Sequence, residues 1–331
     1  MANPVLAEVV RGPVLECVHR GSVAVCRPDG TLELALGTVD QPILPRSACK
    51  MVQALPLVES GAADAAGLTT RHLALACASH NGADIHSGLA ASWLASLGLG
   101  EADLRCGPQV PNDTAAVELL RNAGQQPCQL HNNCSGKHSG MLTLNRHLGG
   151  GTEYIDPDHP VQLAVRAATE ETAREAVAGY ATDGCSAPNF AVTLSGLATA
   201  MAGFARPDEA FDGVRRDASA RLRDAMIAHP ELVAGQGRAC TQIMRACAGK
   251  AAVKTGAEGV FIAILPEAGL GIALKIDDGA TRGSEAAIAA LLARYGALDP
   301  QHPVYARHAD APLLNRRQID CGRVRAAAVL E

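Results

Sequence analysis

The N-terminal segment of the chain carries a strand-like pattern. Val and Leu alternate weakly with polar residues, which is typical of strands that bury one face. The pattern predicts two strands at residues 14–18 and 22–26, joined at Gly21. A third strand at residues 31–36 follows the turn sequence Pro28-Asp29-Gly30. We therefore expect an antiparallel meander at the start of the chain.

The middle of the chain, residues 61–245, carries the spacing of helices separated by loops. The run Asn112-Asp113-Thr114 provides an N-cap for one helix, and the run Pro157-Asp158-His159-Pro160 starts another. The expected helices are residues 84–97, 113–123, 160–178, 191–204 and 209–228. This part of the sequence predicts a helical lobe.

Strand patterns return after residue 250. A strand around Lys254 precedes a hairpin of residues 259–265 and 270–276. A helix is expected at residues 284–295, and residues 296–331 show no strong pattern.

The order of these elements predicts one α+β domain. Its N- and C-terminal strands would form one antiparallel sheet flanked by helices. The sheet lobe would comprise about 1–50 and 250–331, and the helical lobe about 51–249.

Composition narrows the class of protein. The chain has 331 residues, 48% of them hydrophobic, and a net charge of −5, so a large core is available. Only four Phe, one Trp and four Tyr are present, which argues against a nucleic-acid-binding surface. No apolar run approaches a membrane span, and the first residues lack a signal-peptide pattern. We expect a cytoplasmic protein whose 11 cysteines are free thiols.

The first candidate for chemistry is the Ser47-x-x-Lys50 motif, which follows Pro45. A helix that begins near Ser47 would place the hydroxyl and the amine on one face. A neutral Lys50 could then take the Ser47 proton, as in Ser–Lys nucleophiles. The helix N-terminus would stabilise an oxyanion beside Ser47. An isolated motif of this kind equally fits a capping serine and a solvated lysine.

Several motifs together resemble known families. Ser47-x-x-Lys50, followed by Lys254-Thr255-Gly256 on a strand, resembles the serine β-lactamase and penicillin-binding-protein fold. Three further motifs are similar to the Rhizobium etli-type, or class 3, L-asparaginases, over about residues 5–295. They are Ser79-His80-Asn81-Gly82, Asn132-Asn133-Cys134-Ser135-Gly136-Lys137-His138 and Asp183-Gly184-Cys185-Ser186. The chain lacks the Ser-Asp-Asn box of the lactamases, which counts against lactam chemistry.

The asparaginase resemblance implies two Ser–Lys tandems, Ser47 with Lys50 and Ser79 with Lys254. Ser47 would attack the side-chain amide of L-asparagine and form an acyl-enzyme. Lys50 must be neutral to act as the base, and a second cation at Lys254 favours that neutral form. Ser79 would relay a proton. Spacing alone leaves open which serine is acylated.

The resemblance also implies one zinc per chain, held by Cys134, Lys137 and Cys185, beside the substrate and dispensable for the chemical step. Without the resemblance, the same residues equally fit two buried thiols and a substrate-binding lysine. The Arg46 guanidinium is suited to the substrate α-carboxylate. The expected substrate-binding residues are Arg46, His80, Asn81, Asn133, His138, Asp183 and Thr255.

The family implies a homodimer that acts on a small molecule, L-asparagine. The composition indicates no nucleic-acid or membrane partner. Two alternatives stay open. One is a related cytoplasmic serine hydrolase, an esterase or a β-lactamase-like enzyme. The other is a non-catalytic zinc or thiol module built on Cys134 and Cys185.

Overall fold

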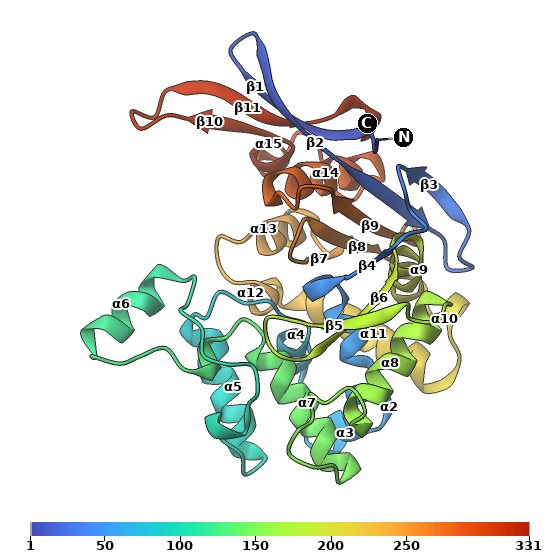
Figure 1. The fold of residues 1–331 in the computed structure, drawn as a ribbon, viewed down its shortest axis with the longest axis vertical. Helices are drawn as coiled ribbons and strands as arrows, with labels where there is room; N and C mark the ends of the chain where they lie inside the picture. The colour runs from blue at the N-terminus through green and yellow to red at the C-terminus, as the bar shows by residue number, and fades with distance from the viewer. Residues whose placement is uncertain (1, 331) are drawn as a thin grey trace. The chain divides into compact units, whose positions relative to one another are not determined.

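The computed structural model describes residues 2–330, and the chain divides into two compact units (Figure 1). The first unit comprises the chain up to Ala48, Val192–Ala210, and the chain from Gln242 onward. The second unit comprises Cys49–Ala191 and Phe211–Thr241. None of the helices in the described residues combines the length and the apolar character that a membrane crossing requires.

The first unit is built on an eight-stranded antiparallel sheet in the order β10-β11-β1-β2-β9-β8-β7, with β3 beside β2. Its strands are β1 Val5–Arg11, β2 Val14–Cys26, β3 Leu32–Leu36, β7 Ala252–Thr255, β8 Val260–Leu265, β9 Leu270–Ile276, β10 Asp310–Leu314 and β11 Asp320–Ala326. The predicted α+β class, with one antiparallel sheet made from both ends of the chain, is confirmed. The predicted hairpin corresponds to β8 and β9.

The predicted break at Gly21 is wrong, because residues 14–26 form one continuous strand, β2. Gly21 is paired with Ile276 of β9. A Cβ atom at Gly21 would lie 2.2 Å from the backbone oxygen of Lys275. The glycine therefore permits a close approach of two strands and does not make a turn.

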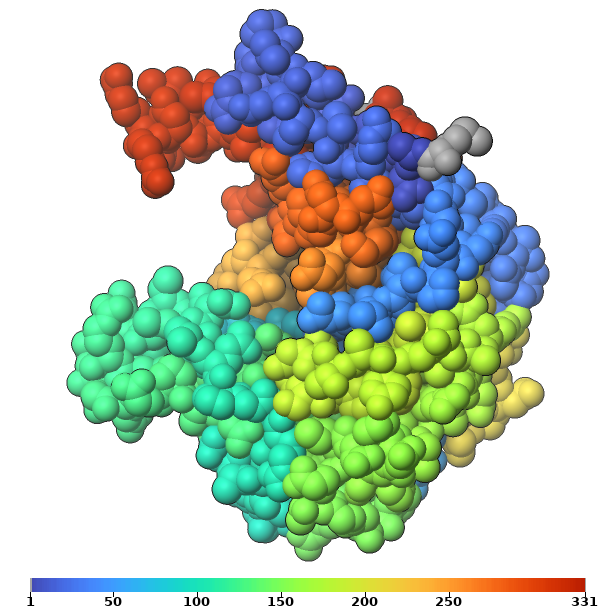
Figure 2. Space-filling view, in the orientation of Figure 1, coloured from blue at the N-terminus to red at the C-terminus, as the bar shows by residue number. Residues whose placement is uncertain are grey.

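The prediction of a patternless C-terminal segment is also wrong. This segment forms α15 Pro303–Ala309 and the hairpin of β10 and β11, and β11 pairs with β1. Val324 is the only fully buried residue of β11, and Arg325 pairs with Glu8 on β1. A strand that is exposed on most of its length shows no apolar alternation. Figure 2 shows that the β1–β2 and β10–β11 hairpins project from the body of this unit.

Two long helices cover the sheet. α9 Leu194–Ala205 packs against β2, β8 and β9, and α14 Thr281–Arg294 packs against β1, β8, β9 and β11. The helix predicted to begin at residue 191 begins later, because residues 188–193 form strand β6. Thr193 caps α9 by accepting a hydrogen bond from the Gly196 amide at 2.9 Å.

The second unit is mostly helical. Asp113 caps α6 as predicted, since its carboxylate accepts a hydrogen bond from the Ala116 amide at 2.9 Å. Helix α8 ends before the predicted residue 178, because Arg174 adopts a left-handed φ of 57°. The chain then forms a hairpin of β5 Gly179–Thr182 with β6 Pro188–Thr193. The remaining predicted helix of residues 209–228 is split into α10 Pro207–Ala210, in the first unit, and α11 Gly213–Ala228.

The helices of this unit are α1 Lys50–Gln53, α2 Leu55–Glu59, α3 Ala62–Ala65, α4 Thr70–Ala76, α5 Asp84–Ser96, α6 Thr114–Asn122, α7 Ser135–Leu148, α8 Pro160–Ala173, α11 Gly213–Ala228 and α12 Pro230–Val233. Helix α13 Ala239–Ala246 crosses the division between the units. Strand β4 Pro42–Ile43 pairs with the end of β6.

Candidate active site

Lys50 is a buried lysine at the start of α1 whose amine has several polar neighbours. The side chain is 1% exposed. Its Nζ lies 2.5 Å from the Ala78 carbonyl oxygen, 3.0 Å from Ser79 Oγ and 3.0 Å from Cys134 Sγ. A serine hydroxyl, a thiol and a lysine amine thus meet at one point in the second unit, where a proton could move between them.

The backbone around Lys50 is shaped by two local features. Arg46 has a left-handed φ of 52°, and a 3-10 turn of residues 46–49 leads into α1. Pro56 lies in the first turn of α2, where a proline costs no helical hydrogen bond. The four-residue α1 therefore carries Lys50 at its first position.

Cys134, Lys137 and Cys185 also meet in the second unit. Cys134 precedes the first turn of α7, and the side chain of Asn132 accepts a hydrogen bond from its amide at 2.9 Å. Lys137 Nζ lies 2.9 Å from Cys185 Sγ. Cys185 belongs to the loop between β5 and β6, where Ser186 has a left-handed φ of 70°. All three predicted zinc-binding side chains are at least 96% buried, with exposures of 3%, 3% and 4%.

The two thiols and the lysine form one electrostatic unit. A hydrogen bond from Cys134 lowers the pKa of Cys185 well below its ordinary value, against the effect of burial, and Lys137 acts in the same direction. The same hydrogen bond, together with burial, raises the pKa of Cys134. Burial opposes the charge of Lys137, but the sulfurs of Cys185 and Cys134 outweigh it and raise its pKa. The charges of Cys185 and Lys137 therefore stabilise each other.

This donor set fits a zinc ion. The described residues contain no group of three or more His, Cys, Asp or Glu side chains that could hold a metal. Cys134, Cys185 and Lys137 instead offer two sulfurs and one amine, and zinc binds thiolate sulfur and neutral nitrogen. Zinc binding would displace the protons that these three groups carry, because zinc binds the thiolate and the neutral amine.

Other predicted residues surround these groups within the second unit. His80 Nε2 lies 3.0 Å from Ser135 Oγ, and burial lowers the pKa of His80 well below its ordinary value. Asn81 donates to an Asp113 carboxylate oxygen at 3.1 Å. The Asn133 amide group donates to Gln109 Oε1 at 3.0 Å.

Asp183 lies in the β5–β6 loop with Cys185. Its carboxylate accepts a hydrogen bond from the Gly184 amide at 2.8 Å, and its charge acts on Lys137 and raises the pKa of that lysine together with the sulfurs. His138 is fully buried on α7, and its Nδ1 lies 2.8 Å from the Tyr154 hydroxyl.

The first unit holds the other predicted residues. Lys254 on β7 is 0% exposed, and its Nζ donates to the Thr255 carbonyl oxygen at 2.7 Å. A Cβ atom at Gly256 would lie 2.7 Å from the Pro45 carbonyl oxygen. The Lys254-Thr255-Gly256 strand end therefore lies directly beside the segment that carries Arg46 and Ser47, both partly exposed.

The structure thus gathers Lys50 and Ser79 with the zinc-binding candidates in one unit, and Ser47 near the Lys254 strand in the other. Each of the predicted pairs, Ser47–Lys50 and Ser79–Lys254, combines one residue of the first unit with one residue of the second. Both pairs stay predictions. Sequence reasoning missed Gln109, Asp113, Ser135 and Tyr154 as partners of predicted residues. No spacing signal connects them, because their contacts arise only in the folded chain.

Comparison with known proteins decides the family. A sequence profile described as L-asparaginase II matches residues 7–326. The chain belongs to the L-asparaginase II family. The resemblance inferred from the motifs is therefore confirmed, and this asparaginase-family chain is an amidohydrolase with a small-molecule substrate.

Solved structures are similar to this L-asparaginase II family member only in part. A β-lactamase from Mycobacterium bovis is 14% identical, with a TM-score of 0.47, over 83% of this chain and 94% of its own. Mglu, in its tris and glutamate form, is 17% identical, with a TM-score of 0.41, over 91% of this chain and 65% of its own. None of the curated proteins compared with the chain matches it.

Proposed function

We propose that this amidohydrolase converts L-asparagine and water to L-aspartate and ammonia through a serine acyl-enzyme. The observation that carries the proposal is the 3.0 Å contact between the buried Lys50 Nζ and Ser79 Oγ. A lysine held against a serine hydroxyl provides a path for a proton. Membership of the L-asparaginase II family supports the choice of substrate.

Ser47 is proposed as the nucleophile. Lys50, three residues later, accepts its proton as Ser47 Oγ forms a bond to the amide carbon. The C–N bond then breaks, and the leaving amine takes that proton and departs as ammonia. Ser79 Oγ contacts the Lys50 amine and passes the proton between the lysine and the leaving group. Water then cleaves the ester and releases aspartate.

The remaining first-unit residues are assigned supporting roles in this proposal. Lys254 is proposed as the lysine of the second serine–lysine pair, with Ser79. Arg46 is proposed to hold the α-carboxylate of the substrate, since a guanidinium binds a carboxylate through two parallel hydrogen bonds. Thr255 is proposed as a further substrate contact.

In the second unit, the proposed substrate contacts are His80, Asn81, Asn133, His138 and Asp183. Cys134, Cys185 and Lys137 are proposed to hold one zinc per chain, which as a Lewis acid would polarise a polar group of the substrate. These three residues also join the start of α7 to the β5–β6 loop, so they keep both segments in place around the substrate.

The cellular setting is part of the proposal. All 11 cysteines are free thiols, as expected for a protein of the reducing cytoplasm. A homodimer is proposed because the family resemblance implies one. Light scattering of the purified protein tests the dimer.

One comparison of substrates tests the activity. Release of ammonia from L-asparagine and L-glutamine is measured beside hydrolysis of a chromogenic β-lactam and a simple ester. We expect ammonia from L-asparagine and little turnover of the lactam and the ester. Acid quenching followed by peptide mass spectrometry should find an aspartyl ester on the peptide that contains Ser47. Turnover of the lactam or ester without ammonia from L-asparagine would contradict the proposal.

A further inference from the structure

Gln109 is a partly exposed glutamine in the loop before α6, and it holds Asn133 by two hydrogen bonds. Gln109 Oε1 accepts one hydrogen bond from the Asn133 backbone N–H at 3.1 Å. The same oxygen accepts a second hydrogen bond from Asn133 Nδ2 at 3.0 Å. One side-chain oxygen therefore fixes both the backbone and the side chain of a residue of the candidate site.

These two hydrogen bonds leave one orientation for each side-chain amide. A backbone N–H can only donate, so the Gln109 atom that faces it must be the oxygen. That oxygen needs a donor from the Asn133 side chain, which places Nδ2 toward Gln109 and Oδ1 on the opposite side. Asn133 Oδ1 accordingly lies 2.9 Å from Cys134 Sγ. A flipped Asn133 amide would bring two oxygens together at Gln109 with no proton between them.

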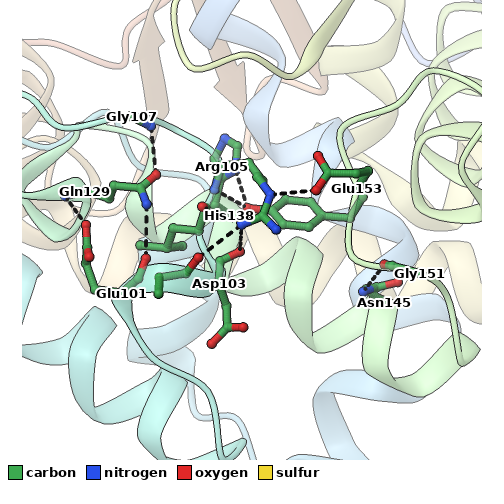
Figure 3. A network of polar contacts seen from close by, with 12 residues as sticks. Glu101, Asp103, Arg105, Gly107, Gln129, His138, Asn145, Gly151 and Glu153 are labelled. Carbon is green, nitrogen blue, oxygen red and sulfur yellow. Dashed lines mark hydrogen bonds and ion pairs between the residues drawn. The ribbon is translucent and has the colours of Figure 1, made fainter.

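The segment that carries Gln109 is anchored to the segment that carries Asn133. Figure 3 shows the contact of Gly107 with Gln129, in which the Gly107 N–H donates to Gln129 Oε1 at 2.9 Å. The Gly107 carbonyl oxygen accepts a hydrogen bond from Asn132 Nδ2 at 3.0 Å. The two segments are therefore joined at Gly107 as well as at Gln109, so Gln109 is kept within reach of Asn133.

Asn133 lies beside the buried amine of the site. Its carbonyl oxygen accepts a hydrogen bond from the His80 backbone N–H at 3.3 Å and lies 3.5 Å from Lys50 Nζ. Cys134 Sγ lies 3.0 Å from Lys50 Nζ. The oxygen of the fixed Asn133 amide therefore faces a sulfur that contacts the Lys50 amine.

We propose that Gln109 is a positioning residue that sets substrate selectivity by fixing the Asn133 amide with its oxygen toward the Cys134–Lys50 group. An amide oxygen accepts hydrogen bonds and cannot donate them. The side-chain amide of L-asparagine offers N–H groups to this oxygen, whereas the side-chain carboxylate of L-aspartate offers only lone pairs. The fixed orientation thus favours substrate over product. This inference rests on the proposed function, in which Asn133 contacts the substrate.

Hydrogen exchange at the Asn133 backbone amide tests the positioning without any substrate. The Asn133 signals are assigned by selective 15N-asparagine labelling and by their loss in Asn133→Ser. Gln109→Met removes the acceptor, and exchange should become about 5-fold to 10-fold faster. Gln109→Glu keeps an oxygen acceptor and should exchange like the wild type. Equal exchange in the wild type and Gln109→Met, or equally fast exchange in both variants, overturns the positioning role.

Kinetics of the same variants test the selectivity. In Gln109→Met the Asn133 amide can rotate and offer an N–H to the product carboxylate. The ratio of the L-aspartate inhibition constant to the KM for L-asparagine should therefore fall by about 10-fold. In Gln109→Glu the ratio should stay at or above the wild-type value, because the acceptor remains. A loss of general packing would raise both constants together, and an unchanged ratio in Gln109→Met overturns the inference.

Gln126→Met is the matched control, because Gln126 is exposed. It should behave like the wild type in both assays, and circular dichroism checks the folding of every variant. Ammonia release by the wild type with an unchanged ratio in Gln109→Met leaves the proposed function intact and overturns this inference alone. If the wild type releases no ammonia from L-asparagine, the proposed function and the selectivity both fail. The exchange result still decides whether Gln109 fixes Asn133, since it needs no turnover.

Discussion

The two units bury very different side chains. In the first unit, every residue of β8 is buried and all of them are apolar, and Lys254 is the only fully buried lysine or arginine among its described residues. The second unit buries Lys50, Lys137, His80 and His138 together with the thiols of Cys134 and Cys185. An apolar sheet gains stability from burial alone, whereas buried polar groups must each find a partner. Substitutions in the interior of the second unit should therefore be tolerated less well than substitutions in the apolar sheet.

The largest effect on activity is expected from replacing each of the two candidate serines, one in each unit, by alanine. Ser47→Ala should lower kcat for L-asparagine by at least about 10³-fold, because it removes the nucleophile. Ser79→Ala should retain an acyl-enzyme but form it slowly, since only the proton relay is lost. Activity and quenched-intermediate mass spectra are measured for both, with circular dichroism as the control for folding. Substantial turnover in Ser47→Ala with none in Ser79→Ala would reverse the two roles.

The second effect is a loss of folding stability in acid, which we expect in the second unit and not in the first. Burial lowers the pKa values of His80, His86 and His138. The unfolded chain binds their protons near pH 6.5 while the folded chain does not, so stability is present above about pH 6.5 and falls as pH drops below it. Between pH 7 and 5.5 the free energy of unfolding should therefore fall, with an upper limit of about 1.4 kcal/mol per pH unit for each histidine.

Urea unfolding at both pH values measures this loss, and hydrogen exchange locates it in the second unit. His86→Leu, which removes one buried neutral imidazole, should flatten the dependence. His147→Gln changes an exposed histidine and serves as the control. Equal pH dependence in wild type and His86→Leu would contradict the prediction.

The third effect tests packing beneath the Cys134–His138 segment. A Cβ atom at Gly136 would lie 2.3 Å from the backbone oxygen of Leu75 on α4. Gly136→Ala should therefore lower the free energy of unfolding by about 2 kcal/mol or more, since backbone must move. Gly88→Ala on α5 is the matched control, because its nearest neighbour would be 3.8 Å away. The control should be neutral or slightly stabilising, and equal losses in both variants would refute the contact.

The smallest effect is expected from loss of the proposed zinc. Metal analysis should find about one zinc per chain. Chelation or Cys134→Ser should raise KM by about 10-fold and lower kcat less, because substrate contacts loosen while the serine and lysine residues remain. A collapse of kcat with unchanged KM would show that the metal takes part in the bond-breaking step. Wild-type behaviour of Cys134→Ser in a metal-free protein would show that these are core thiols.

The sequence predicted elements whose signals are local. Asp113 and Pro160 marked helix starts, and the β8–β9 hairpin followed from its turn and apolar strands. The break predicted at Gly21 was wrong, because a glycine that allows a neighbouring strand to approach closely looks the same in the sequence as a glycine in a turn. β11 was not predicted, because its arginines are partly exposed to solvent and pair with acidic residues on other strands, so the strand lacks an apolar alternation. At the site, short motifs indicated Lys50, Ser79 and Cys134, but the contact of Lys50 with Ser79 joins residues 29 positions apart, and only the fold reveals it.

The pairing of β1 with β11 has a consequence for how the protein is made. Val9 lies opposite Val324 in the sheet, so β1 is synthesised long before the strand that pairs with it. Most of the second unit is one continuous stretch, Cys49–Ala191, which can begin to fold while the ribosome is still adding residues. The sheet can close only after the C-terminal hairpin has emerged. Until then, β1 presents an open edge to other nascent chains.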